Sequence, residues 1–331
     1  MAAYRVAVIG TGGVARNRHL PAIRSSERME LAALADLSQE ALDKCASVGS
    51  IPAYQDYGEM LRREKPDIVG IGTRAGTHCQ IVGDCARAGV RGILCEKPMA
   101  RTLRECEAMI AECETRGVKL AIGHQRRYKE QHQFAKQLID RGELGRLVAL
   151  WGSCPPHFIE WGTHYVDLML WYAGDVGFVM GQISGATRPG RGGYGEPDPV
   201  IGYMHFKSGA IGVLETNLAG RKDDDRPRVI HIRGEQGEAE VMVDGALRYC
   251  TADSPGWVSP PLSPRDGFLL EYENLCDGIE TGREPLDSGR DGMKALEVLL
   301  ALLESARLRS QVALPLAQKE NPLELMEREG K

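Results

Sequence analysis

The chain has 331 residues, of which 43% are hydrophobic and 26% charged, and its formal net charge is −5. At ~150 residues per domain this length predicts roughly two domains, each with a core that needs no disulfide or metal. A mildly acidic chain without a basic run argues against nucleic acid and anionic membrane surfaces as partners. No stretch is apolar over the ~18 residues that a membrane span requires.

Cysteine usage bears on the compartment. The nine cysteines are scattered and form no CxxC pair. This pattern is typical of reduced thiols in a cytoplasmic protein, and it does not favour a zinc cluster. We therefore expect a cytoplasmic protein that binds a small molecule and no metal.

Short apolar runs alternate with helical patterns over the first third of the chain. Buried strands separated by helices predict a parallel, doubly wound α/β sheet. We assign this sheet to a first domain over residues 1–123. Strands are expected at 6–9, 29–35, 68–72, 92–95 and 119–123, and helices at 14–24, 38–48, 78–88 and 103–115.

The pattern changes in the second part of the chain, where apolar runs follow one another through hairpin-like connections. It predicts an α+β domain with a mostly antiparallel sheet over residues 124–316, followed by a polar tail at 317–331. The closing helices are expected to pack back on the first domain. Strands are expected at 147–153, 178–186, 200–207, 210–217, 228–234 and 238–243, helices at 130–141, 163–172, 267–281 and 289–309, and mobile loops at 187–199, 221–228 and 252–265.

A glycine-rich segment, Gly10-Thr11-Gly12-Gly13-Val14-Ala15, follows the first strand and opens a helix. In this context Gly10 permits a tight turn and Gly12 lets a pyrophosphate approach the backbone, where helix N–H groups meet its charge. Asp36 ends the second strand, 26 residues after Gly10. Its carboxylate suits ribose hydroxyls and repels a 2′-phosphate, which favours NAD over NADP. The alternatives are a glycine-rich turn of an unrelated fold, and arginines that receive a 2′-phosphate.

Two further segments carry candidate catalytic groups. Lys97 follows the strand at 92–95, and ligands of open α/β sheets bind at the carboxyl ends of strands. A solvated lysine is an equally good interpretation of that position. Glu160, His164 and Asp167 are spaced i, i+4 and i+7, so one helical face can carry all three. Taken alone, these three residues favour a capping carboxylate and a buried structural histidine.

These segments, in this order and spacing, resemble the glucose–fructose oxidoreductase / inositol dehydrogenase (Gfo/Idh/MocA) family over nearly the whole chain. The resemblance implies a Rossmann domain and an open-faced antiparallel sheet through which homodimers or homotetramers pack. It also implies NAD(P)-dependent oxidation of a sugar or polyol hydroxyl, or the reverse reduction of a carbonyl. The matching segments are the glycine-rich segment at 10–15, Thr73 with His78, Glu96-Lys97-Pro98, Gly123-His124-Gln125-Arg126-Arg127-Tyr128, and Gly162-Thr163-His164-Tyr165-Val166-Asp167-Leu168 with Gly174.

The resemblance also assigns roles to single residues. Lys97 matches the family's catalytic lysine and His164 its catalytic histidine, while Glu160 stands where many members have an aspartate. Trp161 is a candidate for stacking on a sugar face, and Arg127, Tyr128 and Asp167 are further candidates for substrate contacts. The cofactor contacts implied are Gly10, Thr11, Gly12, Gly13, Val14, Asp36, Thr73, His78, Glu96 and Lys97.

Other interpretations of the sequence stay open. The family architecture also serves NAD-dependent glycosidases that act by oxidation and elimination, and a non-catalytic dinucleotide-binding regulator is a third possibility. A cation held by His157, Glu160 and His164 is a weaker alternative, because Pro155-Pro156 disfavours one continuous helix there. Arg126, Arg127 and the loop at 221–228 are interpreted as solvated arginines rather than as a site for an anionic substrate.

Overall fold

The computed structural model describes residues 3–46, 51–183, 187–189, 195–197, 200–216 and 228–330. The chain divides into two compact units, and each is discontinuous in sequence. The first unit comprises Met1–Gln125 and Asp266–Met293, and the second unit comprises Arg126–Arg265 and Lys294–Lys331. The sequence had placed all of 124–316 in one domain.

The first unit is built on a six-stranded sheet in which every pairing is parallel. This confirms the predicted doubly wound sheet. The strand order changes direction between β1 and β4, the kind of switch point where open α/β sheets bind ligands. The strands run in the order β3 (Ala53–Tyr54), β2 (Met29–Ala35), β1 (Tyr4–Ile9), β4 (Ile68–Ile71), β5 (Gly92–Cys95) and β6 (Lys119–Ile122).

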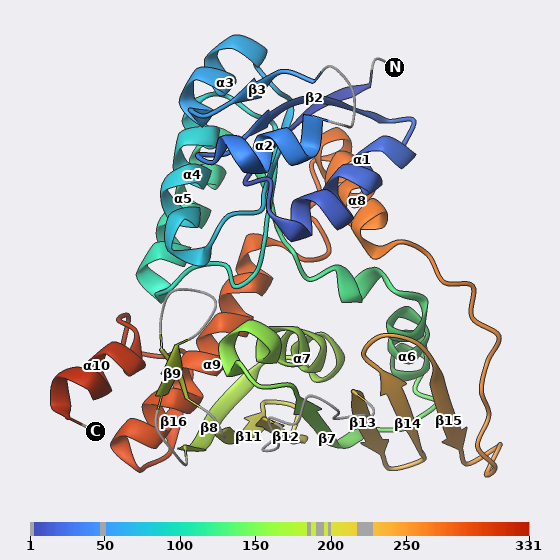
Figure 1. Ribbon diagram of the computed structural model, residues 1–331. Coiled ribbons are helices and arrows are strands. Elements are labelled where there is room, and N and C mark those ends of the chain that lie inside the picture. Colours follow the sequence, from blue (N-terminus) through green and yellow to red (C-terminus); the bar gives the residue numbers. More distant parts are fainter. Residues whose placement is uncertain are drawn as a thin grey trace. The chain divides into compact units, whose positions relative to one another are not determined.

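Helices cover this sheet, as the upper part of Figure 1 shows. One of them, α8 (Gly267–Thr281), comes from late in the chain. Its Tyr272, Leu275 and Cys276 are buried in one core cluster with residues of β1, β4 and β5. Burial of this apolar face explains why the segment belongs to the first unit. The other helices are the π-helical turn η1 (Ala15–His19), α1 (Leu20–Ser25), α2 (Gln39–Ala46), α3 (Tyr57–Glu64), α4 (Ala75–Arg87) and α5 (Leu103–Arg116).

The second unit contains an eight-stranded sheet, which is antiparallel except for the parallel pair β7–β12. This agrees with the mostly antiparallel sheet that was predicted, although the two edge strands β15 and β16 were not. The order is β15 (Leu247–Thr251), β14 (Gly237–Met242), β13 (Val229–Gly234), β7 (Leu147–Cys154), β12 (Ile211–Thr216), β11 (Val200–Phe206), β8 (Val176–Ile183) and β16 (Val312–Ala313). Two short paired strands, β9 (Thr187–Pro189) and β10 (Gly195–Pro197), lie within the predicted loop 187–199, and residues 221–227 of another predicted loop lie outside the described residues.

The two faces of this sheet differ. One face packs against α7 (Phe158–Ala173) and α9 (Gly289–Leu308), with Leu302 of α9 lying directly on Gly181 and Gly202. The opposite face presents exposed apolar side chains. Trp151, Met180, Ile201 and Ile211 are 39%, 51%, 52% and 39% exposed.

The segment predicted as a polar tail contains a helix, α10 (Pro322–Glu329), whose first N–H groups are capped by Asn321. Leu323 and Met326 are buried on one side of it. Two apolar residues three positions apart are enough to dock one short helix face, which the polar composition concealed. The second unit also contains α6 (Glu130–Asp140) and most of the 3₁₀ turn η2 (Gln125–Tyr128). No helix in the described part of the chain has both the length and the apolar character needed to cross a membrane.

Candidate active site

The carboxyl ends of four strands meet at one edge of the first unit's sheet. Backbone hydrogen bonds continue beyond the strands, from the N–H groups of Gly10, Gly72 and Glu96 to carbonyl oxygens at the ends of neighbouring strands, with lengths of 2.8, 2.8 and 2.9 Å. Asp36 follows β2 at the same edge. The sheet therefore brings together the glycine-rich segment, Asp36 and the Glu96-Lys97 turn.

The glycine-rich segment fits a dinucleotide. Gly10 has φ +87°, and a Cβ there would lie 2.8 Å from atoms of Gly72 and Thr73, so only glycine is accommodated. Gly12 and Gly13 are exposed, and a Cβ on either would meet nothing within 4 Å, which leaves space for a phosphate close to the backbone. The exposed Val14 continues this surface.

Asp36 is held in place by Thr11. Its Oδ2 atom accepts hydrogen bonds from the Thr11 N–H at 2.7 Å and the Thr11 hydroxyl at 3.1 Å. The Thr11 side chain is itself buried and positions Asp36, and the cofactor contact of Thr11 stays a prediction. A carboxylate fixed at the end of β2 suits the ribose hydroxyls of NAD.

His78 lies in the interior of the first unit. It is fully buried, and its ring nitrogens lie 3.2 and 3.3 Å from the carbonyl oxygens of Met99 and Thr73. Burial lowers the pKa of its imidazole, so the neutral ring predominates. A neutral imidazole has one N–H, so one of the two ring nitrogens donates to a carbonyl oxygen and holds the ring between the segment after β4 and the segment after Lys97. Direct cofactor contact by His78 stays a prediction. Thr73 itself is half-buried at the strand end.

Glu96 belongs to a buried chain of polar groups. Its Oε1 lies 3.1 Å from Nε2 of His19, whose Nδ1 lies 2.8 Å from the hydroxyl of Tyr272. Burial alone raises the pKa of Glu96, but the hydrogen bond and charge of His19, together with the charge of Lys97, bring it below the usual value. Glu96 is thus an ionised anchor that also accepts from the Lys97 N–H at 3.3 Å. It fixes the half-buried Lys97 at the strand end.

In the second unit, α7 carries the other predicted catalytic residues. It begins immediately after His157, and Glu160 lies in its first turn, where the helix dipole favours a carboxylate. His164 is 3% exposed, and the ring of Trp161 lies 6.3 Å from the His164 ring between centroids. Glu160 and Trp161 are half-buried.

Two of the residues predicted to contact substrate bind each other. Arg127 donates from Nε and Nη2 to the two carboxylate oxygens of Asp167 at 3.0 and 2.7 Å. Both side chains are buried, at 4% and 1% exposure. This bidentate ion pair ties η2 to α7 and pairs the two charges with each other. The substrate contacts of Arg127 and Asp167 stay predictions. Tyr128 is also buried.

The interpretation of Arg127 as a solvated arginine is wrong, since only 3% of the residue is exposed, and so is that of Arg126, of which only 5% is exposed. Nη2 of Arg126 donates to Asp244 at 3.1 Å. Its Nε and Nη1 atoms are buried without a hydrogen-bond partner among the described residues. The guanidinium lies 5.8 Å from the centre of the Trp161 ring. A basic residue in a polar turn carries no sequence signal that distinguishes this burial from solvation.

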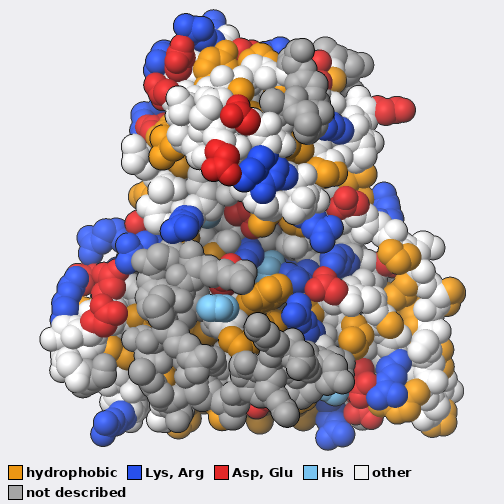
Figure 2. Space-filling model, viewed as in Figure 1, with side chains coloured by type: hydrophobic (Ala, Val, Ile, Leu, Met, Phe, Trp, Pro, Cys, Tyr) orange, Lys and Arg blue, Asp and Glu red, His pale blue; other side chains and the backbone are white. Residues whose placement is uncertain are grey.

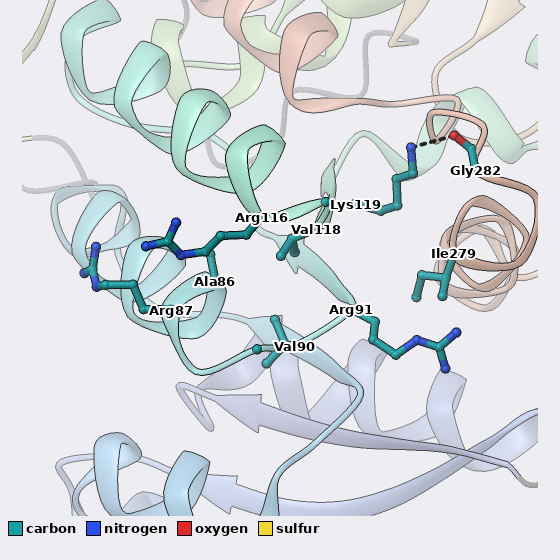
Figure 3. Close-up of a pocket in the computed structure, with 11 residues that line it drawn as sticks. Ala86, Arg87, Val90, Arg91, Arg116, Val118, Lys119, Ile279 and Gly282 are labelled. Carbon is teal, nitrogen blue, oxygen red and sulfur yellow. Dashed lines mark hydrogen bonds between the residues drawn. The ribbon is translucent and has the colours of Figure 1, made fainter.

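A cavity of about 710 Å³ in the first unit lies away from these groups, at the amino ends of β5 and β6 (Figure 3). Four of its cations pair with carboxylates. Arg87 and Arg116 share Glu112 at 2.9 and 3.3 Å, Lys119 lies 2.5 Å from Glu284, and Arg91 lies 3.8 Å from Asp67. The pairing leaves this cavity little net charge to attract an anion.

On the face shown in Figure 2, the coloured Lys and Arg side chains alternate with Asp and Glu instead of forming a continuous basic surface. Within the described ranges, no three His, Cys, Asp or Glu side chains are grouped closely enough to hold a metal ion. The suggested trio of His157, Glu160 and His164 is not such a group.

Comparisons with known proteins agree with this geometry. Residues 4–124 match the model of an oxidoreductase family with an NAD-binding Rossmann fold, and residues 151–314 match that family's C-terminal alpha/beta domain. The chain is 28% identical to D-apiose dehydrogenase of Paraburkholderia graminis, covering 96% of this chain and 92% of the relative. It is 25% identical to myo-inositol 2-dehydrogenase of Thermotoga maritima, covering 94% and 98%. A crystal structure of aldose-aldose oxidoreductase from Caulobacter crescentus, complexed with glycerol, is 25% identical and superposes with a TM-score of 0.84, covering 95% of this chain and all of that one.

Proposed function

Since the chain belongs to the Gfo/Idh/MocA oxidoreductase family, whose first domain is an NAD-binding Rossmann fold, we propose that it oxidises a secondary hydroxyl of a sugar, polyol or sugar derivative, or reduces the corresponding carbonyl. The observation that carries the proposal is the edge of the first sheet, where the open glycine-rich segment, Asp36 and Lys97 follow neighbouring strands. Relatives named as dehydrogenases of a sugar and of a polyol support this substrate class.

The chain's own residues have separable tasks in this reaction. NAD, when bound, supplies a nicotinamide ring that accepts hydride from the substrate carbon. Gly12 and Gly13 admit the pyrophosphate, and Asp36 accepts hydrogen bonds from the adenosine ribose, which favours NAD over NADP. Lys97 stabilises the developing alkoxide with its ammonium charge, and His164 accepts the hydroxyl proton. Glu160 and Trp161, on the same helix as His164, orient the substrate.

The test is a turnover assay on the purified protein with NAD⁺ and, separately, NADP⁺ against sugars, polyols and sugar acids. Reduced nicotinamide and released free sugar are measured in the same reactions. We expect net reduction, greater with NAD⁺ than with NADP⁺. Free sugar without net reduction would indicate a glycosidase. Cofactor binding without either product would support a regulator.

Lys97→Ala tests the assignment of the lysine. Loss of an acid–base or electrostatic group predicts a fall in kcat of roughly 10²–10⁴-fold with little change in cofactor affinity. Lys119→Ala is the matched control, because Lys119 stands at the opposite, amino end of β6 and bonds to Glu284 and the Gly282 carbonyl. Unchanged turnover in Lys97→Ala would remove Lys97 from the chemistry.

We also propose that two or four copies assemble through the open face of the second unit's sheet. Trp151, Met180, Ile201 and Ile211 form exposed apolar surface on neighbouring strands, which a second copy would cover. Ile201→Glu should then lower the mass measured by light scattering to that of one chain. A monomeric wild-type protein would contradict the proposal.

All nine cysteines are free thiols, which supports a reducing compartment, the cytoplasm.

A further inference from the structure

Resting on the proposed function, we propose that the substrate carries an anionic group, a carboxylate or a phosphate, and that Arg126 and Arg228 bind it beside Trp161. All three residues belong to the second unit. The substrate class is thereby narrowed from sugars and polyols in general to sugar acids or sugar phosphates.

The first observation is the unsatisfied guanidinium of Arg126. Its side chain is 6% exposed, and Asp244 engages only Nη2. The buried Nε and Nη1 carry three of the five N–H donors of the group, and none has an acceptor among the described residues. A buried donor without a partner costs about 1–3 kcal/mol, and more when it is charged. An acceptor from a ligand would remove this cost.

The second observation is Arg228, which directly precedes β13. Its guanidinium carbon lies 4.9 Å from the centre of the Trp161 ring. Guanidinium groups from two separate segments therefore contact the Trp161 ring. Arg228 is exposed, and within the described residues no carboxylate pairs with it. It is therefore the cation that an incoming anion can reach, while Arg126 supplies buried donors.

The described charged groups around Trp161 carry an excess of positive charge. Asp244 is the carboxylate that pairs with both Arg126 and Lys129. Burial raises the pKa of Asp244, but the charges and hydrogen bonds of Arg126 and Lys129 lower it to about 2, so one negative charge is present at neutral pH. Among the described residues, Arg126, Arg228 and Lys129 thus outnumber this one carboxylate, and counting Glu160 in the first turn of α7 as a second anion still leaves one positive charge in excess.

Tyr165 adds a neutral donor to the cluster. Its hydroxyl is buried without a hydrogen-bond partner among the described residues. Burial raises its pKa, while the charges of Arg126 and Arg228 act in the opposite direction. Tyr165 lies four residues after Trp161 on α7, so the two side chains are on the same side of the helix. Guanidinium and hydroxyl donors that share one location form the arrangement that binds carboxylate and phosphate oxygens.

The location relative to the chemistry follows from α7. Trp161 contacts the guanidiniums with its ring, and the same ring lies 6.3 Å from that of His164. The anionic group would therefore be bound about one aromatic ring away from the proton acceptor.

The test compares matched charged and neutral compounds. Wild-type enzyme with NAD⁺ is assayed on D-gluconate against D-glucitol, and on D-glucose 6-phosphate against D-glucose, while binding of the same four compounds to the protein with NADH is measured by calorimetry. We expect one of the two anions to bind more tightly than its neutral partner by roughly 10- to 150-fold. This is the range for a hydrogen bond to a charged group. The gluconate and phosphate arms distinguish the two anionic groups.

Variants then assign the effect to the arginines. Arg228→Gln should raise KM and Kd for the anion by that factor and leave the neutral compound unchanged, and Arg126→Gln should do the same. Because Arg126 is buried and its variant can fail to fold, the exposed Arg228 decides the test alone. Arg233→Gln is the matched control, since Arg233 is an exposed arginine of β13, five residues after Arg228, that pairs with Glu238 at 3.5 Å.

The outcomes separate this inference from the proposed function. Equal handling of charged and neutral compounds, or anion binding that Arg228→Gln leaves unchanged, would overturn the anion site while turnover still supported the dehydrogenase. Anion binding that depends on Arg228, without turnover of any compound, would support the site and contradict the reaction. Binding of none of the four compounds would also overturn the inference.

Discussion

Two buried polar clusters, one in each unit, have opposite hydrogen-bond states. In the first unit, Tyr272, His19 and Glu96 form a chain in which both ring nitrogens of the histidine are engaged. In the second unit, Arg126 and Tyr165 keep buried donors without partners among the described residues. A saturated cluster holds its neighbours in position, whereas a cluster with spare donors gains from binding an acceptor. We therefore interpret the cluster in the first unit as support for the position of Lys97, and the cluster in the second unit as a ligand-binding site.

Adjacent arginines make the same contrast within one turn. Arg127 gives two nitrogens to a carboxylate that is as buried as itself, while Arg126 gives one nitrogen to Asp244, whose side chain is 45% exposed. Bidentate, fully desolvated pairing indicates that Arg127 is structural. Partial pairing with a solvated carboxylate leaves Arg126 available.

Removing the carboxylate that pairs with each arginine should give the largest difference in the free energy of unfolding. Asp167→Asn leaves the Arg127 charge buried and uncompensated, which predicts a loss of about 3–5 kcal/mol in the free energy of unfolding. Asp244→Asn should cost about 1 kcal/mol, because Asp244 is 45% exposed and solvent screens its charge. Urea unfolding followed by circular dichroism measures both. Equal losses would show that Arg126 is as structural as its neighbour.

Removing one hydroxyl from each cluster should have a smaller effect and distinguish them again. Tyr272→Phe deprives His19 of its Nδ1 partner inside the core, which predicts a loss of about 1–3 kcal/mol in the free energy of unfolding. The same urea measurement checks it. Because ionised Glu96 only accepts hydrogen bonds, Nε2 of His19 donates to it and cannot compensate for the lost contact. Unchanged stability would mean that the chain of polar groups does not anchor the Lys97 turn.

Tyr165→Phe should leave stability nearly unchanged, because the hydroxyl that it removes has no partner among the described residues. The expected effect is on binding, as a weaker affinity for the anion measured by calorimetry with no change for its neutral counterpart. If instead Tyr165→Phe destabilised the protein as much as Tyr272→Phe, the hydroxyl would have a structural partner, and the contrast between the clusters would fail.

The sequence predicted most of the fold because the regular parts have strong periodic signals. Apolar runs separated by helices identified most strands of the first sheet, apolar runs joined by hairpin-like connections identified most strands of the second, and the Gfo/Idh/MocA resemblance was confirmed. The elements that it missed, such as β3, β16 and α10, are short and depend on tertiary partners for their stability. The position of α8 in the first unit also depends on long-range burial, which a local pattern does not contain.

Less of the candidate site could be predicted, for a physical reason. Glycine-rich segments and strand ends have local signatures, so the placement of Asp36 and Lys97 at one edge follows from the pattern. The partner of an arginine does not, because Arg127 and Asp167 are 40 residues apart and meet only when η2 packs on α7. Two adjacent arginines therefore looked equivalent, although one of them is saturated and the other is not. The catalytic roles of Lys97, Glu160 and His164 remain predictions.

Lowering the pH should produce the smallest change in the free energy of unfolding. It tests the charge of Asp244 beside Arg126 directly. The folded-state pKa of Asp244 is about 2, below its usual 3.8, mainly because Arg126 and Lys129 outweigh the effect of burial. A depressed carboxylate pKa adds stability that is complete above the unfolded-state value and is lost as the pH falls through the folded-state value. The stability difference between wild type and Asp244→Asn should therefore narrow as urea unfolding is repeated from about pH 5 towards pH 3. A difference that stayed constant over this range would mean that the Asp244 charge does not contribute, and that Arg126 and Lys129 are balanced by other groups.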